Sequence, residues 1–336
     1  MNSPRRALTV ALIAALALSS GCTWFSPKPP KEAKDMVQTA LTNFFTQSSH
    51  DHTGTLELNM LGKDTTGKAQ NVTLRVSLSG SENKPFQGGT GFTEKIGVNA
   101  KVDQDTYVTN LEIRNKENNF FVNIANLTGP ESQIPKDQVS ALLAKWWKIP
   151  LPGDMYAKLA DQGAQSYMSQ IQNNWLAASS YLKSLDYDGT DTVNGLKSYH
   201  YTGEVDVGKL QAFFEGFFKS QGAEMTSTDL KSLQEIFASS KATIDFWISM
   251  DTLVLDRVKV VARIDKITGD DGKTAGKADA TFDLSYSNFG KPVVIEEPVG
   301  STEFNLFGMF GDGEEIPPED SVSDPVKTPV KTPAKK

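Results

Sequence analysis

The sequence predicts an α+β fold: a strongly curved antiparallel β-sheet, a half-barrel of about ten strands, whose concave apolar face is covered by helices. Apolar and polar residues alternate with a period of two along most of the chain, which is the pattern of strands with one buried face. Turn residues separate these runs, as expected between antiparallel strands. Helical periodicity is confined to a few segments, which argues against a repeated βαβ arrangement.

The first predicted element is an amphipathic helix over residues 32–47. Val37, Leu41, Phe44 and Phe45 fall on one of its faces, which indicates packing against a core. Half-buried strands follow, with turns of Gly, Asn and Asp residues between them. The strands are predicted at 55–60, 72–78, 107–113, 120–124, 199–207, 242–248, 258–264 and 278–286, and the turns at Gly67, 88–89, 118–119, 250–252 and 269–272.

Four further segments show helical spacing of apolar residues. They are residues 136–148, 155–182, 208–220 and 227–239, and the last begins with a Ser-Thr-Asp capping signal. Two of them present more aromatic surface than a narrow contact with a sheet needs. These rings either fill a core or line an apolar cavity between helices and sheet. The candidate lining residues are Trp146, Trp147, Leu210, Phe213, Phe214, Phe217 and Phe218.

The N-terminus has the pattern of a lipoprotein signal peptide. Arg5 and Arg6 precede an apolar run that is too short to span a bilayer, and small residues lead to Cys22, the only cysteine. Ser19 stands where a branched apolar residue is usual. We expect cleavage before Cys22 and acylation of its sulfur, with a plain secretory signal or an uncleaved anchor as the alternative.

The domain organisation follows from composition. Residues 1–21 are the predicted signal peptide, 22–31 a Pro- and Lys-rich lipidated tether, 32–310 the folded domain with a helical insertion at about 135–182, and 311–336 a disordered Pro/Lys tail. After cleavage 32 basic residues would face 41 acidic ones, a net charge of −9. This acidic balance makes nucleic acid an unexpected partner.

Motifs for catalysis, metals or cofactors are not evident. His50-Asp51-His52 has no cysteine or third histidine nearby and is interpreted as a solvated turn, and His200 as a surface imidazole. The acidic segment 186–191 is interpreted as an ordinary turn, because Lys197 stands where a calcium loop would need a glutamate. We predict a protein that is not an enzyme, with no metal and no cofactor.

Three sequence segments in the second half of the chain resemble segments of one protein family. They are residues 188–201 (DGTDTVNGLKSYHY), 246–260 (FWISMDTLVLDRVKV) and 282–298 (FDLSYSNFGKPVVIEEP), and they follow the cysteine and the first helix in that order. The chain thereby resembles the LolA-like superfamily, nearest the LppX/LprG-type envelope lipoproteins, over about residues 32–298. The resemblance implies a half-open barrel closed by helices around an apolar cavity that holds or carries lipids. It brings no enzymatic residues.

The first functional hypothesis is therefore a lipoprotein anchored to a bacterial cell membrane, outside the cytoplasm, that binds or carries a lipid, lipoglycan or acyl chain. The second is a lipid-tethered scaffold or sensor that binds an envelope protein through its aromatic surface or the insertion at 135–182. The third is a hydrolase built from carboxylates on separate strands, which would leave no local motif.

Overall fold

The computed structural model describes residue 29 and residues 31–63, 67–83, 91–116, 119–130, 140, 142–150, 178–211, 227–268 and 274–304. The chain divides into two compact units, residues 1–303 and 304–336. All elements described below belong to the first unit. In the described part of the chain, no helix is both long and apolar enough to cross a membrane.

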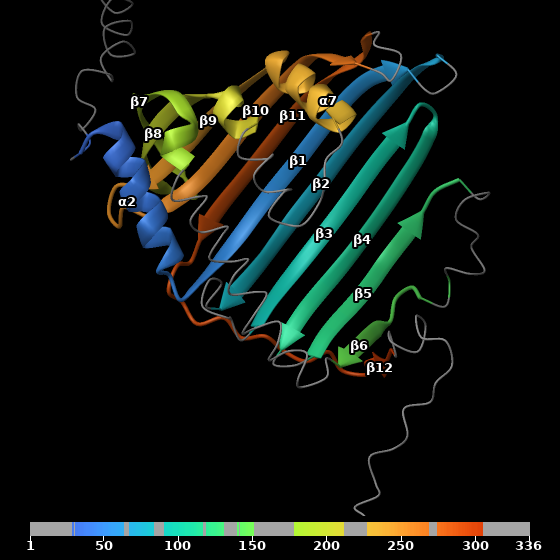
Figure 1. Ribbon diagram of the computed structural model, residues 1–336. Coiled ribbons are helices and arrows are strands. Elements are labelled where there is room, and N and C mark those ends of the chain that lie inside the picture. The colour runs from blue at the N-terminus through green and yellow to red at the C-terminus, as the bar shows by residue number, and fades with distance from the viewer. Residues whose placement is uncertain are drawn as a thin grey trace, which may run out of the picture. The chain divides into compact units, whose positions relative to one another are not determined.

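One 12-stranded sheet organises the first unit, with the strand order β12-β6-β5-β4-β3-β2-β1-β11-β10-β9-β8-β7 (Figure 1). All neighbouring strands are antiparallel except β12 and β6, which are parallel. The strands are β1 (Ser49–Lys63), β2 (Ala69–Asn83), β3 (Gly91–Val102), β4 (Asp105–Lys116), β5 (Asn119–Thr128), β6 (Trp146–Pro150), β7 (Leu182–Val193), β8 (Leu196–Val205), β9 (Ser240–Ser249), β10 (Leu255–Thr268), β11 (Thr274–Ser287) and β12 (Thr302–Glu303).

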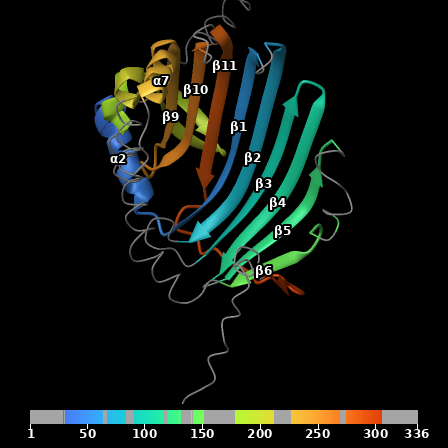
Figure 2. The same ribbon diagram turned by 45° about the vertical axis from the view of Figure 1, so that its right-hand side comes forward.

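Two runs of sequential antiparallel strands make up this sheet. One runs from β1 to β6 and the other from β7 to β11, and the pairing of β1 with β11 joins them (Figure 2). The predicted antiparallel sheet is thus confirmed, with 12 strands instead of about ten. The predicted α+β class is corrected to mostly β, because the described helices are few and short. The closure of its strands into a half-barrel stays a prediction.

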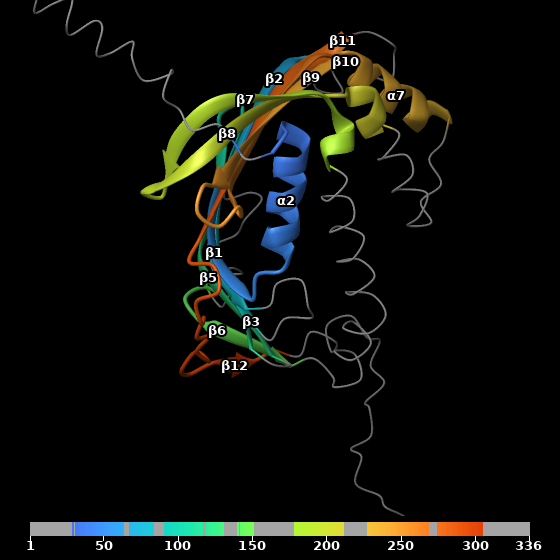
Figure 3. The same cartoon turned by 90° about the vertical axis from the view of Figure 1, so that its left-hand side faces the viewer.

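Helices pack on one side of the sheet, as the nearly edge-on view of Figure 3 shows for α2 (Ala33–Phe45) and α7 (Ser227–Ala238). The predicted helices at 32–47 and 227–239 are confirmed. α2 contacts β7, β9, β10 and a 3₁₀ turn at Ala178–Tyr181, whereas α7 contacts β9 and β10. Val37, Leu41, Phe44 and Phe45 are all buried, as the apolar stripe of the helix predicts.

Residues 186–191, predicted to be an acidic turn, lie in strand β7 instead. The turn that reverses the chain is Asn194-Gly195, where both residues have positive φ angles of 50° and 82°. This dipeptide is the preferred sequence for the tight turn of a hairpin, because Asn and Gly tolerate the left-handed backbone. The strand predicted at 199–207 is the second arm of that hairpin, β8.

Of the predicted helices at 136–148 and 155–182, the described residues confirm only a helical residue at Ser140 and a 3₁₀ turn at Ala178–Tyr181, and the ends of both predictions are wrong. Residues 146–150 form strand β6, which pairs with β5, and Leu182 begins strand β7. The greater parts of both segments lie outside the described residues. Short apolar runs fit a strand and a buried helix equally well, so spacing alone could not separate them.

Candidate functional site

The side of the sheet that faces α2, here called the inner face, carries a continuous apolar surface. Directly paired residues of neighbouring strands point to the same face, so the register lists each row across the sheet. The row through Leu56 continues through Val76 to Val98 in one direction and through Phe282 to Val260 in the other. Three parallel rows, through Gly54, Leu58 and Met60, also consist of apolar residues and glycine on β10, β11, β1, β2 and β3.

The opposite face of the same strands is polar. Between the inner-face residues of β1 stand Thr55, Glu57 and Asn59, and Glu57 pairs with Arg75 across the ladder. The nitrogen Nε of Arg75 lies 3.5 Å from Glu57 Oε1. This strict alternation means that a shift of one residue in register would bury the charges, so it fixes which face is apolar.

Burial of the inner face changes across the sheet. Tyr201, Phe246 and Val258, beside α2 on strands β8 to β10, are all fully buried. The apolar residues of the four rows on β1, β2 and β3 are only half-buried. The four rows extend about 20 Å along each strand at a rise of about 3.4 Å per residue. An apolar surface of this length is therefore left partly accessible beyond α2.

Trp146 and Trp147, predicted to share one helical stripe, lie on opposite faces of the sheet, because neighbouring residues of a strand alternate. Trp147 pairs with Val122 in an inner-face row, and its indole nitrogen donates to the carbonyl of Leu142 over 3.1 Å. Trp146 lies on the other face, with the Arg114 guanidinium 4.7 Å from its ring centre. Of the pair, only Trp147 is positioned to line the inner face.

Leu210 follows β8 and packs partly buried against the core formed by α2 and the sheet. Its role in lining a cavity stays a prediction. The other candidate lining residues, Phe213, Phe214, Phe217 and Phe218, lie outside the described residues, and so does Cys22.

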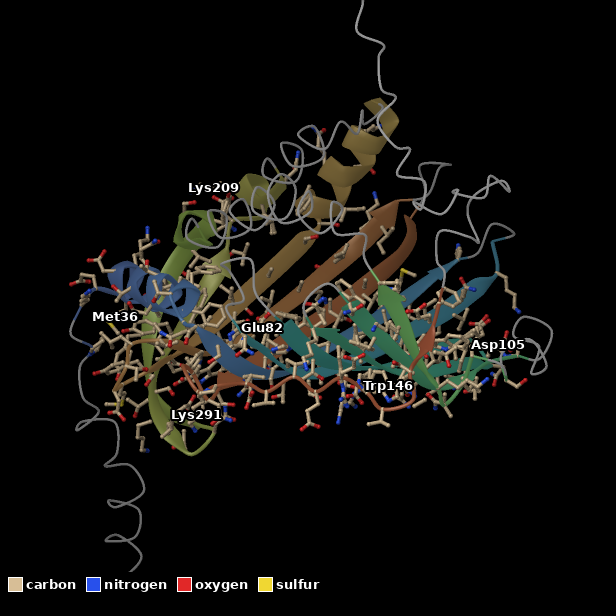
Figure 4. All side chains as sticks on the ribbon, turned by 90° about the horizontal axis from the view of Figure 1, so that it is seen from below. Met36, Glu82, Asp105, Trp146, Lys209 and Lys291 are labelled. Atoms are coloured by element: carbon tan, nitrogen blue, oxygen red, sulfur yellow. The ribbon has the colours of Figure 1, made fainter. Side chains whose placement is uncertain are left out.

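A cluster of histidines and glutamates interrupts the apolar face at its end nearest α2. His50 and His52 belong to strand β1, so the prediction of a solvated turn is wrong. His50 is 1 % exposed, and its Nε2 lies 3.0 Å from Glu82 Oε1 on β2. His52 Nε2 lies 2.6 Å from Glu94 Oε2 on β3. Glu82, at the end of β2, is labelled in Figure 4.

Competing effects act on the pKa of His52. Burial disfavours the charged imidazolium, whereas the hydrogen bond and the negative charge of Glu94 favour it, with smaller contributions from Glu82 and Asp51. The favourable effects prevail and raise the pKa of His52 above its ordinary value. Glu82 and Glu94 were missed in the sequence, because only the strand register reveals that they stand beside the histidines.

His200 lies on the polar face, as predicted, but it is held in place there. Its ring stacks on Trp247 with 4.5 Å between centres, and its Nε2 lies 3.1 Å from Asp245 Oδ1. The Arg257 guanidinium also lies 4.5 Å from the Trp247 ring and pairs with Asp283. This row of stacked and paired side chains ties β8, β9, β10 and β11 together on the side away from α2.

Hollows lined by described residues lie at strand ends and on the polar face. One is bordered by Leu61, Asn71, Asp103 and Lys277 at the far ends of β1, β2 and β11. Another lies over the outward residues of β7, β8 and β9, among them Asp186 and Glu204. Their mixed linings do not suit an acyl chain. The apolar cavity predicted between the helices and the sheet stays a prediction.

Comparison with known proteins gives likenesses of structure only. No protein-family model and no curated protein sequence matches this chain. Among solved structures, the Mycobacterium tuberculosis lipoprotein LppX matches with 12 % identity and a TM-score of 0.30, covering 80 % of this chain and 100 % of its own. LprF from Mycobacterium bovis matches with 17 % identity and a TM-score of 0.33, covering 82 % and 100 %.

A DUF1329 family protein from Desulfovibrio piger also matches, with 12 % identity and a TM-score of 0.22, over 80 % of this chain and 96 % of its own. LppX is also named in the family that the sequence resembles. Identities and TM-scores this low say nothing about a ligand. Only the residues of this chain can support a function.

Proposed function

We propose that this protein is an envelope lipoprotein that binds the acyl chain of a lipid against the inner face of its sheet. The observation that supports this is the change in burial across the inner face: Tyr201, Phe246 and Val258 beside α2 are fully buried, whereas the residues of the four apolar rows on β1, β2 and β3 are half-buried. An apolar surface of this extent that the described residues leave partly accessible is costly in water and is typical of a binding site.

The energetics favour an acyl chain as the occupant. Each methylene group that leaves water for an apolar surface gains about 0.8 kcal/mol. On the inner face of β11, β1, β2 and β3, the stretch from the row through Gly54 to the row through Met60 carries no charged side chain. A flexible chain of methylene groups needs no hydrogen-bonding partner along this stretch. The half-barrel predicted from the sequence would wrap the strands around such a chain.

The anchor is part of the proposal. Acylation of Cys22 and the tether at 22–31 would hold the folded domain close to a bacterial cell membrane, outside the cytoplasm. We expect the protein in the membrane fraction and an acylated N-terminal peptide by mass spectrometry. A Cys22→Ala variant should yield no acylated peptide, and an acylated peptide from that variant would contradict the assignment.

The binding site is tested with paired substitutions on the two faces of the sheet. Val76→Thr combined with Val98→Thr replaces two neighbouring inner-face methyl groups by hydroxyls and keeps the branched side chains that suit strands. We expect affinity for a fluorescent fatty acid to fall about tenfold, because these hydroxyls must lose water when the chain binds. The assay uses the protein that begins after Cys22, stripped of bound lipid with organic solvent.

The matched control is Ser77→Thr combined with Asn99→Thr, on the polar face of the same two strands. It should bind as the unaltered protein does. An equal loss of affinity for the fatty acid in the two double variants would contradict the proposed site. So would the absence of saturable binding by the unaltered protein. The alternative of a tethered scaffold predicts instead a protein that carries no lipid and co-purifies with an envelope protein.

A further inference from the structure

Four side chains with metal-binding atoms meet on the inner face, and the register of three strands brings them there. His50 and His52 are two residues apart on β1 and therefore point to the same side. His50 pairs with Glu82 of β2, whereas His52 pairs with Gly80, which in turn pairs with Glu94 of β3. Register therefore places two imidazoles and two carboxylates next to one another on the inner face.

The separations in the cluster are close to those of a coordinated ion. One ligand atom each from His50, His52 and Glu82 lie within 4.8 Å of one another. Two atoms that bind the same zinc ion at about 2.0–2.1 Å can be no more than about 4 Å apart. The upper limit of 4.8 Å on the three separations is therefore within about 1 Å of what one zinc ion requires.

Gly80 makes room for the fourth group. A side chain at this position would clash with Glu94 Oε2 and would approach His52 Cε1 to 3.1 Å. Glycine otherwise weakens the interior of a strand, and it commonly marks a place where other groups approach closely. Here it lets the carboxylate of Glu94 reach across β2 to the imidazole of His52.

Glu94 also determines which nitrogen of His52 is left to bind. The pairing of Nε2 with the Glu94 carboxylate leaves Nδ1, which is buried and has no hydrogen-bond partner among the described residues. A metal-binding histidine commonly donates its other ring nitrogen to a carboxylate in this way, which fixes its tautomer and its orientation.

The surroundings favour a dehydrated ion. The rings of Phe44, Tyr286 and Phe289 pack around His50, with ring centres 5.2 to 6.1 Å from its own. The side chains of His52 and Glu94 are 14 % and 17 % exposed. In such a site the two carboxylates balance the charge of a divalent cation, and nitrogen with oxygen ligands suits zinc better than calcium or magnesium.

We propose that His50, His52 and Glu82 bind a zinc ion, with Glu94 as the residue that orients His52. The ion would join the ends of β1, β2 and β3 where the apolar face meets α2. The zinc proposal does not rest on the proposed lipid-binding function. Without a metal the same residues form two histidine–glutamate pairs, His50 with Glu82 and His52 with Glu94, which is the outcome that the experiment must distinguish.

The experiment is a titration of the chelator-treated mature protein, in detergent, with zinc chloride, followed by calorimetry. We expect about one zinc ion per chain, and a rise in melting temperature, because binding to the folded state stabilises it. His52→Gln, which removes the ligand nitrogen and keeps a similar shape, should weaken binding at least 100-fold. Glu94→Gln should weaken it about tenfold, as expected of a residue that orients a ligand.

The chain supplies its own control in His200, its third histidine, which lies on the other face of the sheet. His200→Gln should bind zinc as the unaltered protein does. X-ray absorption of the zinc complex should show two imidazole nitrogens, a readout that does not depend on affinity. If zinc does not bind saturably, or binds equally well to folded His52→Gln protein, the proposal is overturned. The cluster is then two histidine–glutamate pairs without a metal.

Discussion

Asp256 is a carboxylate buried beside the core, 5 % exposed, whose Oδ2 accepts a hydrogen bond of 2.7 Å from the Ser198 hydroxyl. Burial raises the pKa of Asp256 to about 6, the Ser198 hydrogen bond opposes this, and Asp251 adds to it. Because the folded-state pKa lies above the usual 3.8, the folded protein binds more protons than the unfolded one between these values. This carboxylate therefore costs stability that is recovered as the pH falls from about 6 towards 4.

The substitution Asp256→Asn should remove this cost, because the amide is uncharged and its oxygen can still accept from Ser198. We expect the free energy of unfolding near neutral pH to rise by about 1 kcal/mol, after allowance for solvent screening, and the gain to vanish near pH 4. Urea unfolding at a series of pH values measures both. Asp105→Asn, at an exposed position on β4 away from Asp256, is the control, and an unchanged pH slope in Asp256→Asn would contradict the account.

At the scale of single residues, the sequence predicts apolar positions well and polar ones poorly. The stripe Val37, Leu41, Phe44 and Phe45 is buried as its spacing indicates. His50 and His52 are predicted to lie in a solvated turn because they fall between the first predicted helix and the first predicted strand. Their burial depends on Glu82 and Glu94, which are far away in the sequence and become neighbours only through strand pairing.

Among the elements, α2 closes one end of the apolar face, and Phe44 is central to that contact. Its ring lies 4.5 Å from that of Tyr286 on β11 and 5.6 Å from that of Phe45. Phe44→Ala should lower the free energy of unfolding by about 3–5 kcal/mol, because it leaves a cavity between helix and sheet. Thermal or urea unfolding measures the loss.

Thr42→Ala, on the exposed side of the same helix, should change stability by no more than about 0.5 kcal/mol. Similar losses in Phe44→Ala and Thr42→Ala would indicate that α2 does not depend on this packing. Circular dichroism of each variant shows whether its helical content is retained. This distinguishes a loss of packing between α2 and the sheet from a loss of the helix itself.

Element types could be predicted wherever apolar residues alternate over long runs, as on β1, β2 and β11. They could not be predicted where a run is short, and Trp146-Trp147 suits a helix and a strand equally. The hairpin of β7 and β8 had a usable signal in Asn194-Gly195, because this dipeptide favours a two-residue turn. The turn is instead predicted at residues 186–191, because their acidic composition is typical of a turn.

The whole sheet depends on a pairing that no local pattern reveals. Residues 51–61 of β1 align with residues 277–287 of β11, so strands from opposite ends of the folded unit become neighbours. This pairing converts two shorter sheets into one with a common apolar face. Alternation along each strand predicts that such a face exists, but its extent follows only from the strand order.

The most direct test of the account is to locate a bound acyl chain on the folded protein. A fatty acid with a diazirine near the end of its chain would be bound, photolysed and mapped by mass spectrometry. We predict adducts at the inner-face positions of β1, β2 and β3, around Leu58, Leu74 and Val98, that an excess of unlabelled fatty acid abolishes. Adducts confined to the polar face, or labelling that excess fatty acid leaves unchanged, would contradict lipid binding by this sheet.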